Sequence, residues 1–254
     1  MRILLSNDDG IYAPGLAALR DALQDVALVY ISAPDRERSA NGHQITMYRP
    51  IRARVVSYPG SAAQGWAVDG TPADSVKLAL DELLPAPPDL VVAGINQGPN
   101  LGTDVLYSGT VAAAIEAHAS GYPALAISLA SYQTQDFSQA GAFIKTFVTS
   151  RAGVWPKETL LNINVPAGAP QGVRVTRLGV REYRDVFDKR THPRGWDYYW
   201  MAGQYHDRDG DDPDTDAWAV SHGYISVTPL QYDLTDYRAL QETKDLLART
   251  FGAG

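Results

Sequence analysis

Residues 1–15 read MRILLSNDDGIYAPG, and this stretch decides the fold that we expect for the chain. Its residues 2–6 are an apolar run that ends in a polar turn with a glycine, which is typical of a buried strand in a parallel sheet. Leu16, Leu19 and Leu23 follow at helical spacing, and residues 27–34, ALVYISAP, form a second apolar run. A strand, a helix and a strand in this order predict a right-handed parallel crossover.

The alternation of apolar strands and helices continues to about residue 155, where the character of the chain changes, although residues 159–166 still resemble a core strand. Helices are expected over residues 71–84, 110–119 and 136–150, and buried strands over residues 87–96, 122–129 and 159–166. Residues 47–60 and 65–70 are predicted to be strands outside this alternation. Further on, strands without intervening helices are expected over residues 173–180, 196–203 and 223–230, followed by a helix over residues 236–250.

These elements predict an α/β fold with a Rossmann-like, mostly parallel sheet flanked by helices, a β-rich C-terminal extension and a terminal helix. We expect one domain over residues 1–254. In it, residues 1–150 form the Rossmann-like core, and residues 151–254 complete the core and add a β-hairpin arm and a C-terminal helix. Long hairpins without a core of their own often pack on another subunit, so we expect an oligomer.

Composition limits the kinds of partner and metal. The chain has 254 residues, a formal net charge of -7 and no cysteine. A stable complex with nucleic acid is not expected, because no large basic field is available. Without thiolates, a metal must be held by oxygen or imidazole, which favours Mg or Mn. No long apolar stretch resembles a signal core or a membrane span, so a cytoplasmic location without membrane contact is expected.

The first candidate loop, SNDDG, contains two adjacent carboxylates, Asp8 and Asp9. Ligand sites in open parallel sheets form at the carboxyl ends of the strands, where this loop lies. Two carboxylates with neutral oxygens suit a hard divalent cation. The alternative is a structural turn whose aspartates cap the following helix.

The second candidate loop, APDRERSANGH, supplies Ser39 and Asn41 as neutral oxygen ligands, with Arg36 and Arg38 as anion donors. The same charges also fit a self-paired surface loop. His43 could serve as a general acid near neutral pH, or it could be a hydrogen-bonded surface residue.

The third candidate loop, GINQGPNLGTDVLYSGT, follows the strand over residues 87–96. Asn96 ends the strand, and the glycines of the loop allow a ligand close to the backbone. Ser108, Gly109 and Thr110 begin an alanine-rich helix whose free N–H groups and hydroxyls could hold a phosphate, and Asn100 could donate to the same anion. An ordinary glycine loop with a Ser/Thr helix cap is the alternative. If the three strands are parallel neighbours, all three loops meet at one edge of the sheet.

Other sequence motifs are missing or incomplete. No P-loop, dinucleotide-binding glycine motif or GxSxG elbow is present in the sequence. Residues 207–216, DRDGDDPDTD, resemble a calcium loop, but Asp212 stands where the required glycine belongs and Trp218 where the closing Glu belongs. We expect this acidic stretch to be a solvated loop.

The ordered set of motifs resembles the SurE family of survival-protein nucleotidases over nearly the whole chain. The resemblance rests on MRILLSNDDGIYAPG, APDRERSANGHQIT, VDGTPADSVKLAL, GINQGPNLGTDVLYSGTVAAA and LLNINVP, with YYWMAG, DTDAWAV and GYISVTPL after them. It implies a metal-dependent phosphomonoesterase that hydrolyses nucleoside 5′- and 3′-monophosphates, with short polyphosphate as a further substrate in some members. It also implies a homodimer or homotetramer with exchanged C-terminal segments.

The resemblance also assigns residues to roles. It implies that one Mg or Mn ion is held by Asp8, Asp9, Ser39 and Asn96, and that phosphate contacts Asn100 and the helix start Ser108, Gly109 and Thr110. Members of the family differ at the position of Asn41. In the mechanism that we favour, Asp8 and Asp9 are the catalytic residues and water attacks phosphorus near Asp8. A binding module for nucleotide or metal, built on the same cleft, is the alternative function.

Overall fold

A computed structural model describes residues 1–150, 154–184 and 186–252. Strand β1 (Arg2–Ser6), helix α1 (Pro14–Leu23) and strand β2 (Leu28–Pro34) form the predicted crossover, and the two strands pair in parallel. Pro14 suits the start of α1, because the first helical residue has no need of a backbone N–H. The three leucines at helical spacing are buried, as their pattern predicts.

The largest sheet forms the centre of the molecule. Among the described residues it has nine strands, in the order β3-β4-β2-β1-β5-β6-β7-β13-β8. The strands from β4 to β7 in this order are parallel, and β3 and β13 run antiparallel to their neighbours β4 and β7. The strands not yet bounded are β3 (Ala53–Ser57), β4 (Gln64–Val68), β5 (Leu90–Gln97), β6 (Ala124–Leu129), β7 (Leu160–Val165), β8 (Val173–Val175) and β13 (Ile225–Pro229). Strand order reverses at β1, which lies between β2 and β5, and such a switch point is where open α/β sheets bind ligands.

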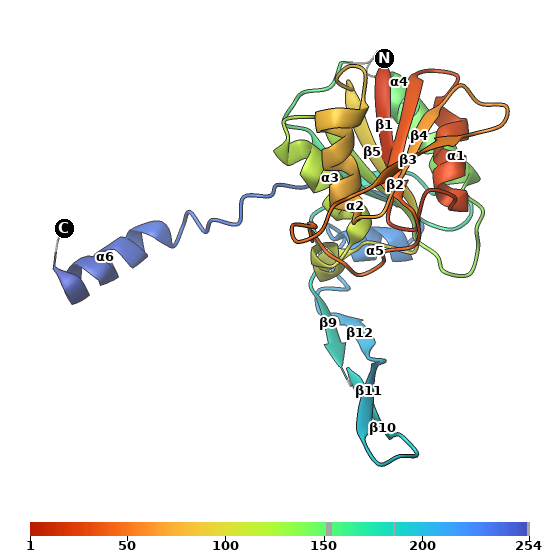
Figure 1. Cartoon of the computed structure of the whole chain (residues 1–254). Helices are drawn as coiled ribbons and strands as arrows, with labels where there is room; N and C mark the ends of the chain where they lie inside the picture. Colours follow the sequence, from red (N-terminus) through yellow and green to blue (C-terminus); the bar gives the residue numbers. More distant parts are fainter. Residues whose placement is uncertain (151–153, 185, 253–254) are drawn as a thin grey trace.

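Helices cover both faces of the sheet (Figure 1). On one side lie α2 (Pro72–Leu78), which continues as a π-helical turn over Ala79–Leu83, and α3 (Gly109–Ala119). On the other side α1 packs near α4 (Ser138–Ser150). Two separate clusters of buried apolar side chains fill these layers, as expected for a sheet buried on both faces. A capping box between Thr71 and Asp74 begins α2, where the Thr71 hydroxyl accepts from the Asp74 N–H and the Asp74 carboxylate accepts from the Thr71 N–H.

Two C-terminal segments leave this body (Figure 1). Strand β9 (Arg181–Arg184) pairs with β12 (Gln204–Asp207), and β10 (Phe187–Thr191) pairs with β11 (Asp197–Met201), so that together they make one long antiparallel arm. Helix α6 (Leu240–Phe251) lies at the end of an extended stretch and has no buried residue. The predicted fold class, with its β-rich extension and terminal helix, is confirmed. No helix within residues 1–150, 154–184 and 186–252 is both long and apolar enough to cross a membrane.

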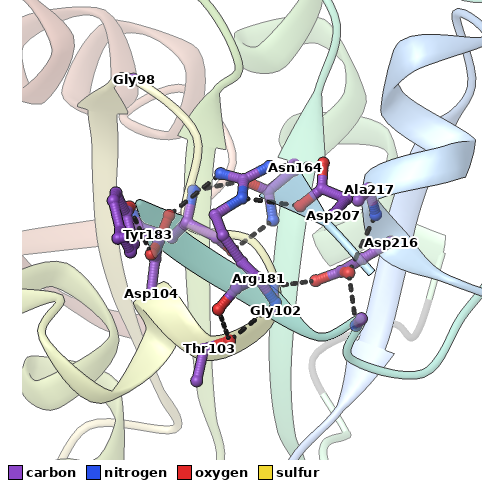
Figure 2. Close-up of polar contacts among 12 residues, drawn as sticks. Gly98, Gly102, Thr103, Asp104, Asn164, Arg181, Tyr183, Asp207, Asp216 and Ala217 are labelled. Carbon is purple, nitrogen blue, oxygen red and sulfur yellow. Dashed lines mark hydrogen bonds and ion pairs between the residues drawn. The ribbon is translucent and has the colours of Figure 1, made fainter. Parts of the chain in front are cut away.

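The acidic stretch over residues 207–216 is only in part the solvated loop that we expected: residues 208–214 form exposed or partly exposed turns, but its last two residues are buried. Asp216 begins helix α5 (Asp216–Ser221), is fully buried, and accepts backbone N–H bonds from Gly102, Gly179 and Ala217 (Figure 2). Other carboxylates of the stretch form ion pairs with Arg177 and Arg181. The partners of these acids come from distant parts of the chain, which a local pattern of charges does not show.

Candidate active site

The turn after β1 presents two adjacent carboxylates to the switch point. The Asn7 side chain closes this turn: its Nδ2 donates to the carbonyl of Gly10 at 2.9 Å, and its Oδ1 accepts from the Gly10 N–H at 3.2 Å. Gly10 has φ +105°, a conformation that glycine adopts without strain. Asp8 is buried and Asp9 partly buried, so both carboxylates are held where water is limited.

The N-terminus of α3 packs directly on Asp8. The Thr110 hydroxyl donates a hydrogen bond to Oδ1 of Asp8. A methyl group placed on Gly109 would lie 2.7 Å from Cβ of Asp8 and 2.9 Å from its Oδ2, so only glycine allows this approach. Ser108 is the N-cap and accepts from the Val111 N–H at 3.0 Å. The positive end of the helix dipole is therefore directed at a carboxylate.

The second predicted loop contacts the same turn. The backbone N–H of Arg38 donates to the carbonyl oxygen of Asp8 at 2.7 Å, which brings Ser39 next to the aspartates. The Ser39 hydroxyl donates to Oε1 of Glu37 at 2.7 Å, and its oxygen lone pairs remain for a ligand. Further along the loop, the Gly42 N–H donates to the carbonyl of Tyr107 at 3.1 Å. The loop that contains Asn41 therefore spans the site from β1 to the segment before α3.

The third predicted loop meets Asp9. The register between β5 and β6 shifts between Ala93 and Asn96, where the peptide bond from Gly94 to Ile95 is cis. Beyond the shift, the Gln97 N–H lies 3.4 Å from Oδ2 of Asp9. The amide nitrogen of Asn96 donates to the carbonyl of Gly98 at 2.7 Å, so its Oδ1 is the atom left to accept or to ligate. The three loops meet at one edge of the sheet, as their positions after parallel strands predicted.

Asn100 is fixed in a buried polar network beyond this loop. Its Nδ2 donates to the Ser128 hydroxyl at 2.8 Å, and its N–H donates to Oδ1 of Asn164 at 2.8 Å. Its carbonyl accepts from Asn162 at 2.8 Å and from Asn164 at 3.0 Å. An amide nitrogen carries two hydrogens, so one N–H of Asn100 remains for an anion.

His43 lies away from the aspartates. Its Nε2 is 2.9 Å from Oε2 of Glu116, whose other oxygen accepts from Lys77 at 3.1 Å. Glu116 follows Thr110 by six residues on α3, which is about 9 Å along the helix. The structure therefore brings the turn of Asp8 and Asp9, the loop that carries Ser39, the end of β5 with Asn96 and the start of α3 to one edge of the sheet, and it pairs His43 with Glu116 on α3.

Burial of two adjacent acids makes their ionised forms unfavourable. Burial raises the pKa of Asp8 above its usual value, although the hydrogen bond from Thr110 opposes this shift. The pKa of Asp9 is raised to about 6, first by burial and then by the neighbouring Asp8, with a smaller contribution from Glu37, while the hydrogen bond from the Gln97 N–H opposes the shift. A bound cation would reverse this penalty, because an opposite charge within a few ångströms favours the carboxylate form.

The donor set fits a hard divalent cation. Among the described residues, no group of three or more His, Asp or Glu side chains could hold a metal ion, and the acids of this site are the pair Asp8 and Asp9. The carboxylates of Asp8 and Asp9, the free Oδ1 of Asn96 and the oxygen of Ser39 offer oxygen ligands to such a cation. Oxygen ligands of this kind suit Mg or Mn better than softer metals.

Three contributions to the site were missed by the sequence reasoning. Glu37 places a third negative charge close enough to act on both aspartates. The Gln97 N–H contacts Asp9 through the backbone, so no side-chain signal marks it. Ser128, Asn162 and Asn164 fix Asn100 by hydrogen bonds. In the sequence they are visible only as polar residues that interrupt apolar strands.

Comparison with known proteins assigns the family. The family described as "Survival protein SurE" matches residues 3–185. A protein named 5′-nucleotidase SurE from Pelotomaculum thermopropionicum is 62% identical over 97% of this chain and 95% of its own length. The protein of that name from Carboxydothermus hydrogenoformans is 50% identical, covering 100% of this chain and 98% of its own. The crystal structure of the SurE protein from Aquifex aeolicus superposes with a TM-score of 0.82 at 38% identity, covering 97% of this chain and 99% of that one. The chain belongs to the survival protein SurE family.

Proposed function

We propose that the chain is a metal-dependent phosphomonoesterase that hydrolyses nucleoside 5′- and 3′-monophosphates to nucleoside and phosphate. Relatives that match it over nearly the whole length are named 5′-nucleotidases, so the chain is a nucleotidase and nucleoside monophosphates are its substrates. The observation that supports the proposal most is the pair of adjacent acids at the switch point: Asp8 is buried against the N-terminus of α3, and Asp9 is partly buried beside it.

One divalent ion, Mg or Mn, would be held by Asp8, Asp9, Ser39 and Asn96. When bound, such an ion supplies positive charge that polarises a phosphoryl group and lowers the pKa of a bound water. Asp9 is the more accessible carboxylate, and the contact with Gln97 fixes its direction. Asp8 is fixed more firmly, by the Thr110 hydroxyl on one side and by the close approach of Gly109 on the other.

The remaining groups of the site are donors suited to phosphate oxygens. Unpaired N–H groups at the start of α3, the Ser108 hydroxyl and the second N–H of Asn100 can bind the anion and hold it for attack. Since these donors are in place before substrate arrives, they can stabilise the charge that shifts among the phosphoryl oxygens during transfer. In this proposal water attacks phosphorus near Asp8, whose carboxylate would orient the water and accept its proton.

Phosphate release from AMP tests this proposal. The purified protein should release phosphate in the presence of Mn, lose that activity in EDTA, and regain it when Mn is restored. Asp8→Asn should abolish turnover and leave the fold intact, as judged by circular dichroism. Saturable AMP binding without phosphate release would instead support a binding module. Full activity of Asp8→Asn would show that the aspartate is structural.

The proposal extends to substrates and location. Short-chain polyphosphate is a further candidate substrate, because the donors at α3 recognise phosphoryl oxygens and not the group attached to them. A cytoplasmic location is also proposed, since a chain without cysteine gains nothing from an oxidising compartment.

We also propose that two or four copies assemble through the C-terminal segments. Helix α6 has 12 residues, none buried, and a helix of that length is marginal alone in water. Its exposed apolar residues are Leu240, Leu246, Leu247 and Phe251. The outer strands β10 and β11 are exposed throughout, although a two-stranded ribbon is marginal by itself. Light scattering should show a dimer or tetramer that Leu246→Asp with Leu247→Asp reduces to a smaller species; an unchanged mass would contradict assembly through α6.

A further inference from the structure

Three tyrosines from separate segments lie together where the arm joins the core. Tyr132 follows β6, and Tyr183 and Tyr205 stand directly opposite each other on β9 and β12. Their exposed fractions are 74%, 45% and 60%, respectively. The segment from Gly98 to Asp104 connects them, because the Tyr132 ring lies against Gly98 and the Tyr183 hydroxyl donates to Asp104.

A buried arginine, Arg181, contacts the ring of Tyr205 directly and reaches Tyr183 through Asp104; Figure 2 shows the second of these contacts. Arg181 donates to both carboxylate oxygens of Asp207 at 2.8 Å and 3.1 Å, and to Asp104 at 2.9 Å. Its guanidinium carbon lies 4.0 Å from the centre of the Tyr205 ring, and the Tyr183 hydroxyl donates to Asp104 at 2.6 Å. The rings are therefore positioned before any ligand arrives, which reduces the entropy lost on binding.

The cluster adjoins the loop that carries Asn96. A methyl group placed on Gly98 would lie 2.2 Å from Cε1 of Tyr132, so this ring covers the backbone of Gly98. Gly98 is the next residue after Gln97, whose N–H contacts Asp9, and consecutive Cα atoms are only about 3.8 Å apart. An aromatic surface thus begins within one residue of the proposed metal and phosphate site.

We propose that Tyr132, Tyr183 and Tyr205 form the subsite that binds the nucleobase of the substrate. This inference rests on the proposed function, since it places the phosphate at Asp8 and Asp9. Tyrosine rings offer flat apolar faces on which any base can stack, with little loss of side-chain freedom. A subsite of this kind favours nucleotides over phosphate esters that lack a base, and it is tolerant of base identity.

Kinetics with paired substrates test the subsite. For the wild type and for Tyr132→Ala, kcat/KM is measured with AMP and with ribose 5-phosphate, which lacks the base. Loss of one stacking ring should lower the ratio of the two values by about 5- to 100-fold, mainly through a higher KM for AMP. Tyr132→Phe should keep the wild-type ratio, because the ring is retained. Tyr48→Ala, which removes a fully exposed ring elsewhere, is the matched control and should also keep it.

Several outcomes would overturn the subsite. If Tyr132→Ala lowers kcat/KM equally for AMP and ribose 5-phosphate, Tyr132 is a structural residue. If kcat/KM changes for neither substrate, the ring does not stack on the base. A changed molecular mass of Tyr132→Ala would assign the rings to a contact between subunits. If the wild type has the same kcat/KM for the two substrates, the subsite alone is overturned. If it releases phosphate from neither substrate, the nucleotidase proposal itself is overturned.

Discussion

Asp9→Asn is expected to stabilise the protein when divalent cations are removed. The pKa of Asp9 is raised from 3.8 to about 6, first by burial and then by the neighbouring Asp8. Asparagine keeps the shape of the side chain and keeps an oxygen for the Gln97 N–H, but it cannot ionise. The substitution therefore removes an unfavourable charge without opening a cavity.

The sign and size of the effect follow from the pKa. The protonated acid stabilises the fold fully below its unfolded pKa of 3.8, and this contribution is lost as the pH rises through about 6. The difference between the two values corresponds to about 3 kcal/mol, which solvent screening of a partly buried group reduces to about 1–2 kcal/mol. For a chain of this size, that is a change in Tm of about 2–8 °C.

Thermal unfolding in EDTA measures this effect directly. At about pH 8 the Tm of Asp9→Asn should exceed that of the wild type, and at about pH 4.5 the difference should shrink. Adding Mn should raise the Tm of the wild type more than that of the variant. Asp211→Asn, at an exposed position, is the control and should change little. A lower Tm for Asp9→Asn in EDTA at the higher pH would refute the reasoning, since the carboxylate would then be a structural cap.

Three further substitutions test particular contacts. Gly109→Ala should reduce phosphate release from AMP by about tenfold or more and should also lower the Tm, because the new methyl group meets Cβ of the buried Asp8 at 2.7 Å. Gly141→Ala in α4, where the nearest atom is 3.5 Å away, should leave activity and Tm intact, and equal activity of the two variants would contradict the close approach. Thr110→Val removes the donor to Asp8 and should lower the free energy of unfolding in urea by about 1–3 kcal/mol, whereas no change would show that the bond is unimportant. Arg181→Met leaves two carboxylates without their partner and should cost about 3 kcal/mol in the same assay; wild-type stability would argue against the buried ion pairs.

The core and the meeting of the loops could be predicted because both follow from local patterns. Apolar runs broken by polar turns place β1 and β5, and their carboxyl ends must share an edge once the strands are parallel neighbours. The positions of Asp8, Asp9 and Asn96 at that edge follow without knowledge of any side-chain contact. The cap at Ser108 was likewise visible as a hydroxyl residue before an alanine-rich helix.

The polar contacts between distant segments could not be predicted. Arg181 binds Asp104 across 77 positions, and His43 meets Glu116 across 73. Charged residues carry no periodic signal for such pairs, so the buried Asp216 was read as part of a solvated acidic loop. Strand β8 ends earlier than predicted, because the alternation of side chains does not show where its partner strand ends. Helix α6 begins later than predicted, because helix propensity does not mark the first residue of a helix.

The most direct measurement is the anomalous scattering of Mn in crystals soaked with Mn and AMP. We expect one peak per subunit between the carboxylates of Asp8 and Asp9, with the phosphate at the N-terminus of α3. A peak elsewhere, with both carboxylates directed into solvent, would contradict it.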